Sequence, residues 1–282
     1  MKNIFTIFAY IATLSCELFV EGNEDFTPFL SGSTAASINQ FPFQVAIVIS
    51  EGSSEDVCNG ALIKHKWVLT TANCIRDGKD HKIILGMINI TTKQWESGKI
   101  SNSVITIHPN YNATTKENNI ALIYVADMPV PDGISIATIE IPSGNVNLEG
   151  REVRISGYGK TSASGSIGVR TLNYFDTRIT TTTSCSEIYA HTKSSLCIET
   201  TASKLICAGD LGSPMTSEVS LKRVLLGMGS LTTNACVTDS KALFENVLYH
   251  RNWIMEVSNG TNVSLGLSTA AVLIVMILRN FV

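Results

Sequence analysis

Three short motifs have the sequence pattern of a site for nucleophilic catalysis. In each motif, however, the position of the reactive group holds a side chain that cannot do this chemistry. The motifs are Gly209–Pro214 (GDLGSP), Trp67–Cys74 (WVLTTANC) and Asn119–Leu122 (NIAL). Attack on a carbonyl requires a hydroxyl, a base that removes its proton and a carboxylate that stabilises the charged base. Leu211 has no heteroatom, Asn73 has no titratable nitrogen and Asn119 is neutral. The three motifs therefore lack the groups that such catalysis uses.

The series of motifs resembles the chymotrypsin/trypsin family, whose corresponding motifs read W-V-L-T-A-A-H-C and D-I-A-L and whose nucleophile loop has serine in place of Leu211. The resemblance extends from Phe29 to Val257. Its other segments are Phe41–Val45, Cys58–Ile63 (C-G-G-S-L-I in the family), Ile155–Gly159 (V-A-G-W-G), Val247 and Trp253–Ile254. It implies an all-β trypsin-like domain over residues 29–257, with two antiparallel six-stranded barrels, divided near Asp127–Glu140, and a C-terminal helix.

The resemblance also implies that Asn73, Asn119 and Leu211 replace the histidine, aspartate and serine of the catalytic triad. We therefore expect no catalytic residues and no proteolysis. A displaced catalytic set is the alternative, since five histidines and many serines are present. Ser213 is its candidate nucleophile, at a position where the family has glycine, and it would need a base of its own. We interpret the histidines as surface or packing residues.

The residues at the positions of the specificity pocket also differ from those of active family members. Leu205 stands where a trypsin-like enzyme has its pocket aspartate, and Thr232 and Ala242 replace glycines that line the pocket. Added side chains narrow such a pocket. The resemblance thus favours a pocket collapsed into the core over a retained apolar groove.

Activation by the family's route is not expected. Family zymogens are cut after a basic residue at the place that corresponds to Pro28–Gly32. In this chain no lysine or arginine precedes Phe29 there. In the family the new amino terminus pairs with the aspartate that matches Asp210. Because an unpaired buried carboxylate is costly, Asp210 needs another partner, solvent or a zymogen-like loop.

Composition agrees with one β-rich domain. The chain has 282 residues and 44% apolar content, which suffice for a large core. A net charge of −3 without a long Lys/Arg run gives no electrostatic footprint for nucleic acid.

Helices are predicted only around Ser184–Tyr189 and Val247–Val257. Strands are predicted at Phe43–Ile49, Val68–Thr70, Lys82–Leu85, Ile100–Ile107, Ile120–Val125, Val153–Tyr158 and Val224–Met228.

The N-terminus and the cysteines indicate the secretory pathway. Lys2 followed by the apolar run Ile4–Leu14 is typical of a signal peptide, over about residues 1–20. Removal of Cys16 leaves an even number of the seven cysteines, which predicts disulfides rather than a metal site, since no C-x-x-C pair is present. The family resemblance implies the pairs Cys58–Cys74, Cys185–Cys197 and Cys207–Cys236.

Two further features fit a secreted or cell-surface protein. Glycosylation sequons occur at Asn89, Asn112, Asn259 and Asn262. Residues 258–282 change from a small polar linker to the apolar run Leu265–Leu278, whose 14 residues span about 21 Å as a helix, short of a hydrocarbon core of about 30 Å. The segment favours a glycolipid-anchor signal. A short membrane span and a tail packed on protein are the alternatives.

The sequence therefore predicts a secreted or cell-surface, catalytically inactive serine protease homologue that acts by binding protein. Its partner is expected to be an extracellular protein such as a protease or a protease substrate, and membrane contact is expected through the C-terminal segment. No cofactor, metal or nucleic acid is expected. The alternative functions are an active hydrolase with a displaced catalytic set and a structural surface antigen.

Overall fold

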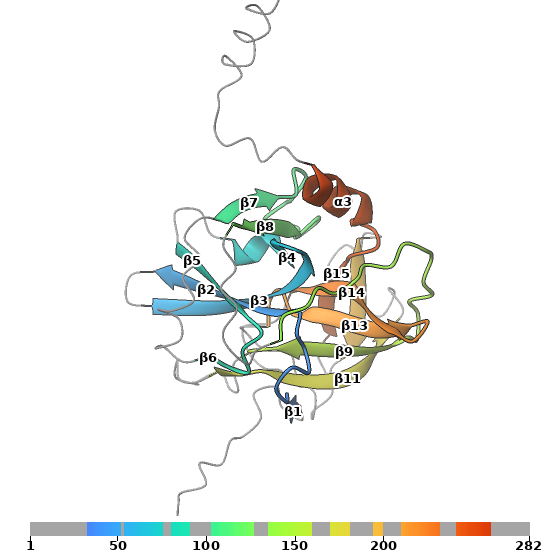
Figure 1. Ribbon diagram of the computed structural model, residues 1–282. Coiled ribbons are helices and arrows are strands. Elements are labelled where there is room, and N and C mark those ends of the chain that lie inside the picture. Colours follow the sequence, from blue (N-terminus) through green and yellow to red (C-terminus); the bar gives the residue numbers. More distant parts are fainter. Residues whose placement is uncertain are drawn as a thin grey trace, which may run out of the picture.

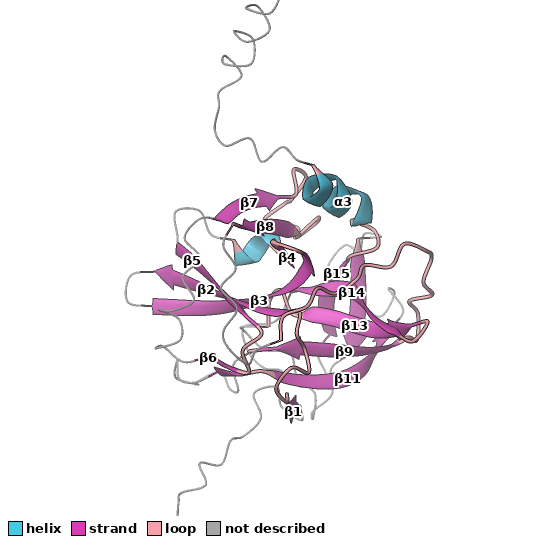
Figure 2. Ribbon diagram, in the orientation of Figure 1, coloured by secondary structure: helices cyan, strands magenta, loops and turns pink. Residues whose placement is uncertain are grey.

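Two antiparallel sheets form most of the protein in the computed structural model, which describes residues 33–51, 54–75, 80–90, 103–126, 135–159, 170–180, 194–199, 210–231 and 241–260 (Figures 1 and 2). Several sequence predictions fall outside these residues. They are the signal peptide, the strand part 100–102, the helix at Ser184–Tyr189, the C-terminal residues 261–282, and the individual residues Leu205, Thr232, Cys185, Cys207, Cys236 and Asn262.

The first sheet curls into a half-barrel. Its strand order is β5 (Asp80–Leu85), β2 (Gln44–Glu51), β3 (Ser54–Lys64), β4 (Trp67–Thr70), β8 (Ala121–Val125) and β7 (Ser103–Ile107). Strand β2 is buried on both faces: Val45, Ile47 and Ile49 belong to one core cluster, whereas Ala46 and Val48 belong to another. Successive strand residues point to opposite faces. The apolar run in β2 therefore joins two cores, and each fully buried Val or Ile contributes about 1.5–3 kcal/mol.

The second sheet closes on itself, because β9 (Glu152–Gly157) pairs with both β13 and β11. The other strands are β1 (Thr34–Ala35), β11 (Asn173–Thr180), β12 (Ser195–Glu199), β15 (Lys241–Asn246), β14 (Lys222–Leu231) and β13 (Pro214–Val219). Apolar residues of these strands, such as Ile155, Phe175 and Phe244, fill the interior. A small pair, β6 (Asn89–Ile90) with β10 (Arg170–Thr171), lies beside the two sheets. The predicted trypsin-like β-barrel architecture is confirmed.

A single α-helix is present among the described residues, α3 (Arg251–Asn259), and it packs against β8. The predicted helix start at Val247 was wrong. The side-chain oxygen of Asn246 accepts hydrogen bonds from the N–H groups of Leu248 (3.1 Å) and Tyr249 (3.3 Å). These bonds hold a turn at residues 247–250, and α3 begins only after it, at Arg251. In the described part of the chain, no helix has the length and apolar content needed to cross a membrane.

The side chain of Asn59 connects the two sheets. Asn59 is fully buried on β3. Its oxygen accepts hydrogen bonds from the backbone N–H of Tyr158, just after β9, at 3.0 Å, and from the Gln44 amide at 3.3 Å. Its amide nitrogen donates to the carbonyl of Leu211 at 3.2 Å. One buried amide therefore positions Leu211 relative to both sheets.

Candidate functional site

Asn73 and Asn119, predicted from distant motifs, lie together in the structure. Asn73 is in the short 3-10 helix η1 (Ala72–Cys74), which follows β4, and Asn119 lies just before β8. The backbone N–H of Asn73 donates to the side-chain oxygen of Asn119 at 2.8 Å. The Asn73 amide donates to the carbonyl of Ser230 at 2.9 Å. Pairing of β4 with β8 brings the two asparagines together.

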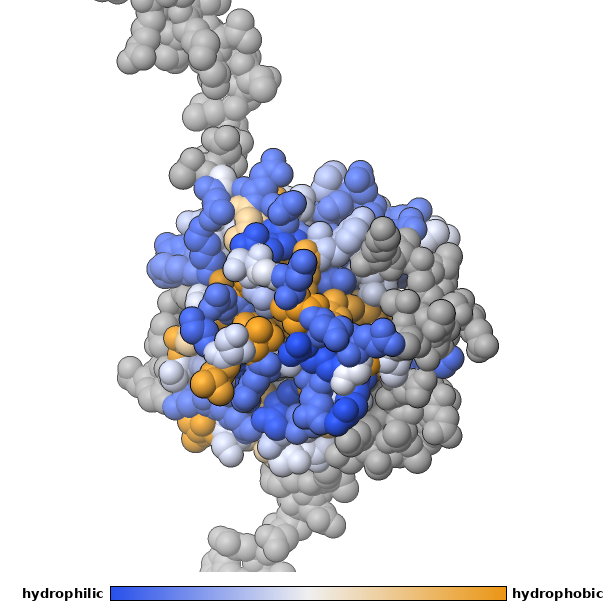
Figure 3. Space-filling model, turned by 90° about the vertical axis from the view of Figure 1, so that its right-hand side faces the viewer, coloured by the Kyte–Doolittle hydropathy of each residue, from blue (hydrophilic) through white to orange (hydrophobic). Residues whose placement is uncertain are grey.

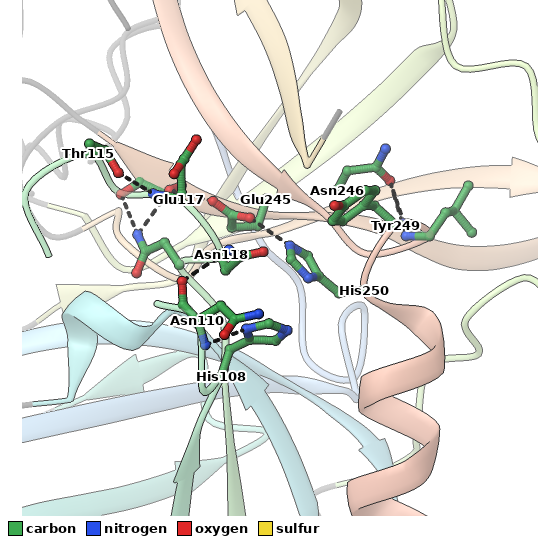
Figure 4. A network of polar contacts seen from close by, with 12 residues as sticks. His108, Asn110, Thr115, Glu117, Asn118, Glu245, Asn246, Tyr249 and His250 are labelled. Atoms are coloured by element: carbon green, nitrogen blue, oxygen red, sulfur yellow. Dashed lines mark hydrogen bonds and ion pairs between the residues drawn. The ribbon is translucent and has the colours of Figure 1, made fainter. Parts of the chain in front are cut away.

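Asn119 continues this network into the protein interior. It is fully buried, and its amide nitrogen lies 3.2 Å from the Ser230 carbonyl and 2.9 Å from the Ser230 hydroxyl. The Ser230 hydroxyl in turn lies 3.3 Å from Oε1 of Glu245. The other Glu245 oxygen, Oε2, lies 2.9 Å from Nε2 of His250 (Figure 4). A continuous polar chain therefore runs from Asn73 to the start of α3.

Aromatic and imidazole groups surround the far end of this chain. The ring of His108 lies 5.4 Å from that of His250 and 4.9 Å from that of Trp253 (Figure 4 labels both histidines). Burial and the nearby His250 lower the pKa of His108. Burial, followed by the charge of Glu245, raises the pKa of Tyr111. The Glu245–His250 pair itself is almost inaccessible, with both side chains 1% exposed.

Sequence reasoning did not identify Ser230, Glu245 and His250 as one polar unit. The sequence indicates a surface or packing role for His250, and no motif includes Glu245. The sequence does contain a signal for Glu245. It is the only acid in the strand Lys241–Asn246, and its neighbours Ala242 to Phe244 are apolar and buried. A charge in such a strand requires a buried partner.

Leu211 lies on a loop whose backbone is held tightly. Its carbonyl accepts the N–H of Asn59 at 2.8 Å, and its half-buried side chain packs against the core cluster that contains Cys58 and Cys74. Gly212 follows with φ of +75°, and its N–H donates to the carbonyl of Gly229 at 2.7 Å. A Cβ at Gly212 would stand 2.0 Å from the carbonyl oxygen of Asn59. Only glycine fits this position without rearrangement.

The two polar residues beside Leu211 are buried. Asp210 and Ser213 are each 1% exposed. A Cβ at Gly159 would stand 2.0 Å from Oδ1 of Asp210, and one at Gly157 would stand 2.5 Å from the Ser213 hydroxyl. Two glycines after and within β9 therefore make room for this carboxylate and this hydroxyl. In the described part of the chain the Ser213 hydroxyl has no hydrogen-bond partner.

The disulfide prediction is borne out where it falls within the described residues. Cys58 and Cys74 are joined, with Cα atoms 5.9 Å apart, so the bond ties β3 to the helix that contains Asn73. Cys197 is also disulfide-bonded, and its predicted partner Cys185 lies outside the described residues. Of the predicted pocket residues, Ala242 is buried in the interior cluster of the closed barrel. No cluster of metal-binding side chains is present among the described residues.

The described sequon asparagines lie at the surface. Asn89, Asn112 and Asn259 are exposed. The Asn112 side-chain oxygen accepts the N–H groups of Thr114 and Thr115. The Asn259 oxygen lies 2.6 Å from Nζ of Lys64, which also donates to the Ser258 carbonyl at 3.1 Å. Use of these sequons stays a prediction.

A polar groove of about 1100 Å³ lies at the ends of β9, β11 and β13. The face that carries these strand ends is largely hydrophilic and hollowed (Figure 3). Within the groove Arg154 makes a bidentate ion pair with Asp176, with nitrogen–oxygen distances of 2.6 and 2.7 Å. Arg178 pairs with Glu152. Its arginines are thus partly neutralised, and the groove has no strong charge of one sign.

The fold and the arrangement of the three motifs define a two-sheet, trypsin-like protein. Residues 30–254 match the family model described as Trypsin. Brachyurin from Leptuca pugilator is 30% identical over 226 residues, covering 79% of this chain and 96% of brachyurin. Trypsin from Sus scrofa is 28% identical, covering 83% of this chain and 96% of that trypsin. Chymotrypsin from Phaedon cochleariae is 25% identical over 77% of each. The chain belongs to the trypsin family.

The tight loop after Leu211 makes the substitution Gly212→Ala a test of the loop geometry. An L-residue at positive φ costs about 1–2 kcal/mol, and the overlap with the Asn59 carbonyl adds about 1–3 kcal/mol. We expect Gly212→Ala to lower the free energy of unfolding by about 3 kcal/mol in urea denaturation. The control Gly144→Ala adds a methyl group in open space and should change it by less than about 0.5 kcal/mol. Equal midpoints for the two variants would contradict the loop geometry.

Proposed function

We propose that this member of the trypsin family is catalytically inactive and acts by binding another protein. The observation that carries the proposal is the amide cluster formed by Asn73, Asn119 and Ser230, with its 2.8 Å contact between the two asparagines. A triad places an imidazole base and a carboxylate in mutual contact. Two neutral amides supply neither a base that can take up the proton of a hydroxyl nor a negative charge that can stabilise such a base.

Leu211 removes the third component, because an alkyl side chain cannot attack a carbonyl. Loss of the serine or the histidine alone lowers turnover by about 2 × 10⁶-fold in subtilisin, a serine protease with the same type of triad. Three simultaneous replacements leave no basis for triad catalysis.

The displaced catalytic set finds little support in the geometry. Ser213 is almost fully buried, which closes its hydroxyl to a substrate. His250 and Glu245 do form a base–carboxylate pair, but both side chains are 1% exposed. A catalytic base must reach the proton that it removes, directly or through one water molecule. Burial of both groups argues against this use.

The first test is an activity assay on purified protein lacking residues 1–20 and 261–282. We expect no hydrolysis of trypsin, chymotrypsin or elastase substrates above the buffer rate and no labelling by a fluorophosphonate probe. Leu211→Ser should stay unlabelled, because Asn73 cannot activate the new hydroxyl. Active trypsin serves as the positive control, and active-site titration excludes a contaminating protease. A covalent adduct on Leu211→Ser would overturn the proposal.

The binding role is supported by an exposed, strained hairpin. Val219 pairs with Lys222, so Ser220 and Leu221 form a two-residue turn between β13 and β14. Both have positive φ, 51° and 63°, and Leu221 is 98% exposed. Such turns favour Asn-Gly, and a bulky residue there is strained. Backbone strain of this kind clusters at active sites, ligand clamps and switch regions. We propose that Leu221 contacts an extracellular protein, either a protease or a protease substrate.

The second test separates binding from stability at this hairpin. Replacing Ser220-Leu221 by Asn-Gly relieves the positive-φ strain, which costs about 1–2 kcal/mol for an L-residue and exceeds the entropic cost of glycine, so we expect a small gain in stability, of about 0.5–1 kcal/mol. At the same time we expect loss of the complex recovered by mild crosslinking on the protein's native cells. Ile38→Ser, which removes another exposed apolar side chain, is the control. Unchanged complex recovery after the Asn-Gly replacement would exclude Leu221 as the contact and favour a structural surface antigen.

We further propose that the protein enters the secretory pathway and is held at the membrane by its C-terminal segment. The Cys58–Cys74 disulfide fits an oxidising compartment. At about 0.8 kcal/mol for each buried methylene, the aliphatic run Ala271–Leu278 is costly to expose to water.

The third test concerns this segment. A glycolipid anchor predicts a mature chain that ends near Ser258–Gly260, and a phosphatidylinositol-specific phospholipase should release it from cells. A short membrane span predicts no release and retention of Arg279. Recovery of a soluble secreted monomer with an intact Val282 would contradict both membrane versions.

A further inference from the structure

The buried polar chain behind Asn119 has an unusual order of donors and acceptors. The Asn119 oxygen accepts the Asn73 N–H, and this contact turns its amide nitrogen toward Ser230. The Ser230 hydroxyl accepts from that amide and has its single proton left for Glu245. Asn119 therefore acts as a donor at the position where the family resemblance implies a carboxylate, which can only accept.

The carboxyl group of the network lies one step further inside, at Glu245. Its two oxygens face different donors, the hydroxyl of Ser230 and the ring nitrogen of His250. The other titratable groups that face the pair are His108 and Tyr111, from the loop after β7, and Tyr249, beside His250. No second carboxylate lies in this described cluster. The network is satisfied with one carboxylate, and only when Asn119 donates.

We propose that Glu245 is a positioning residue that holds the Asn73–Asn119–Ser230 cluster in its non-catalytic arrangement and excludes an aspartate at position 119. An aspartate at position 119 would present an oxygen to the Ser230 hydroxyl from one side while Glu245 presents one from the other. Ser230 has one proton and can serve only one of them. The other carboxylate loses its donor, and two like charges share a buried site, which forces one of them to take up a proton.

The hydrogen bonds of the network are the same whether or not the protein has catalytic activity through another set of residues. Substitution of Asn73, Asn119 and Leu211 by histidine, aspartate and serine would leave Glu245 in competition for Ser230, so that a fourth substitution, Glu245→Gln, is needed. Glutamine keeps the shape of Glu245 and can still bond to Ser230 and His250.

The test is a double-mutant cycle on the purified protein with Asn119→Asp, Glu245→Gln and the double variant, read out as the midpoint temperature of unfolding, Tm, at several pH values. We expect Asn119→Asp to lower Tm at pH 8 by about 4 °C or more. In the Glu245→Gln background the same substitution should cost less than half as much. Asn173→Asp is the matched control, since Asn173 is also 1% exposed but bonds to the Thr171 carbonyl. Its cost should not change with Glu245→Gln.

The pH dependence separates charge repulsion from a loss of packing. A buried aspartate beside Glu245 has a pKa above its unfolded value of about 3.9. Protonation therefore favours the folded state, and the cost of Asn119→Asp should be small below pH 4 and grow as the pH rises through the raised pKa.

Two outcomes would overturn the proposal. One is an Asn119→Asp protein as stable at pH 8 as the parent, and the other is an equal, pH-independent loss in both backgrounds. If Asn119→Asp alone is too unstable to purify, recovery of folded protein from the double variant supports the proposal. Failure of the double variant as well, while Glu245→Gln alone folds, contradicts it.

Discussion

The side chain of Asn59 fixes how the half-barrel, the closed barrel and the loop of Leu211 lie relative to one another. The residue is buried between the half-barrel and the closed barrel, and each contact of its side chain serves a different part of the chain: Gln44 in the first sheet, Tyr158 after β9 and Leu211 in the glycine-containing loop. An unsatisfied buried polar group costs about 1–3 kcal/mol. Because the same amide satisfies both sheets and the loop, their relative positions cannot change independently.

Local sequence patterns predicted the strands that are rich in β-branched residues. The structure has strands at these places, namely β2, β4, β5, β8 and β14. The same rule missed β3, whose sequence SEDVCNGALIK combines acids with asparagine and glycine. These residues disfavour isolated strands, but β3 pairs along its length with β2, and Gly60 allows a close approach to Val68. Tertiary pairing overrode local preference. The helix start failed for the opposite reason, since the side chain of Asn246 forms a local turn that apolar periodicity does not reveal.

In the candidate site, too, some residues could be predicted from local sequence and others could not. Asn73, Asn119 and Leu211 could be found because each stands in a motif whose other residues mostly match those of the family, and their correspondence to the triad rests on that resemblance. Glu245 could not be found in this way, because its partners Ser230 and His250 come from another strand and from the turn before α3. Motifs reveal a missing group at one position. A buried carboxylate that contacts the same cluster is visible only when distant elements are placed together.

Lys64 links the end of α3 to the first sheet. Its ammonium group contacts the Ser258 carbonyl and the Asn259 side chain at the last turn of α3, whereas Lys64 itself ends β3. Tension on the chain after Gly260 therefore reaches α3 and this contact first. Ile254 of the same helix is fully buried in the core, so a load that passes the Lys64 contact acts next on the hydrophobic packing of α3.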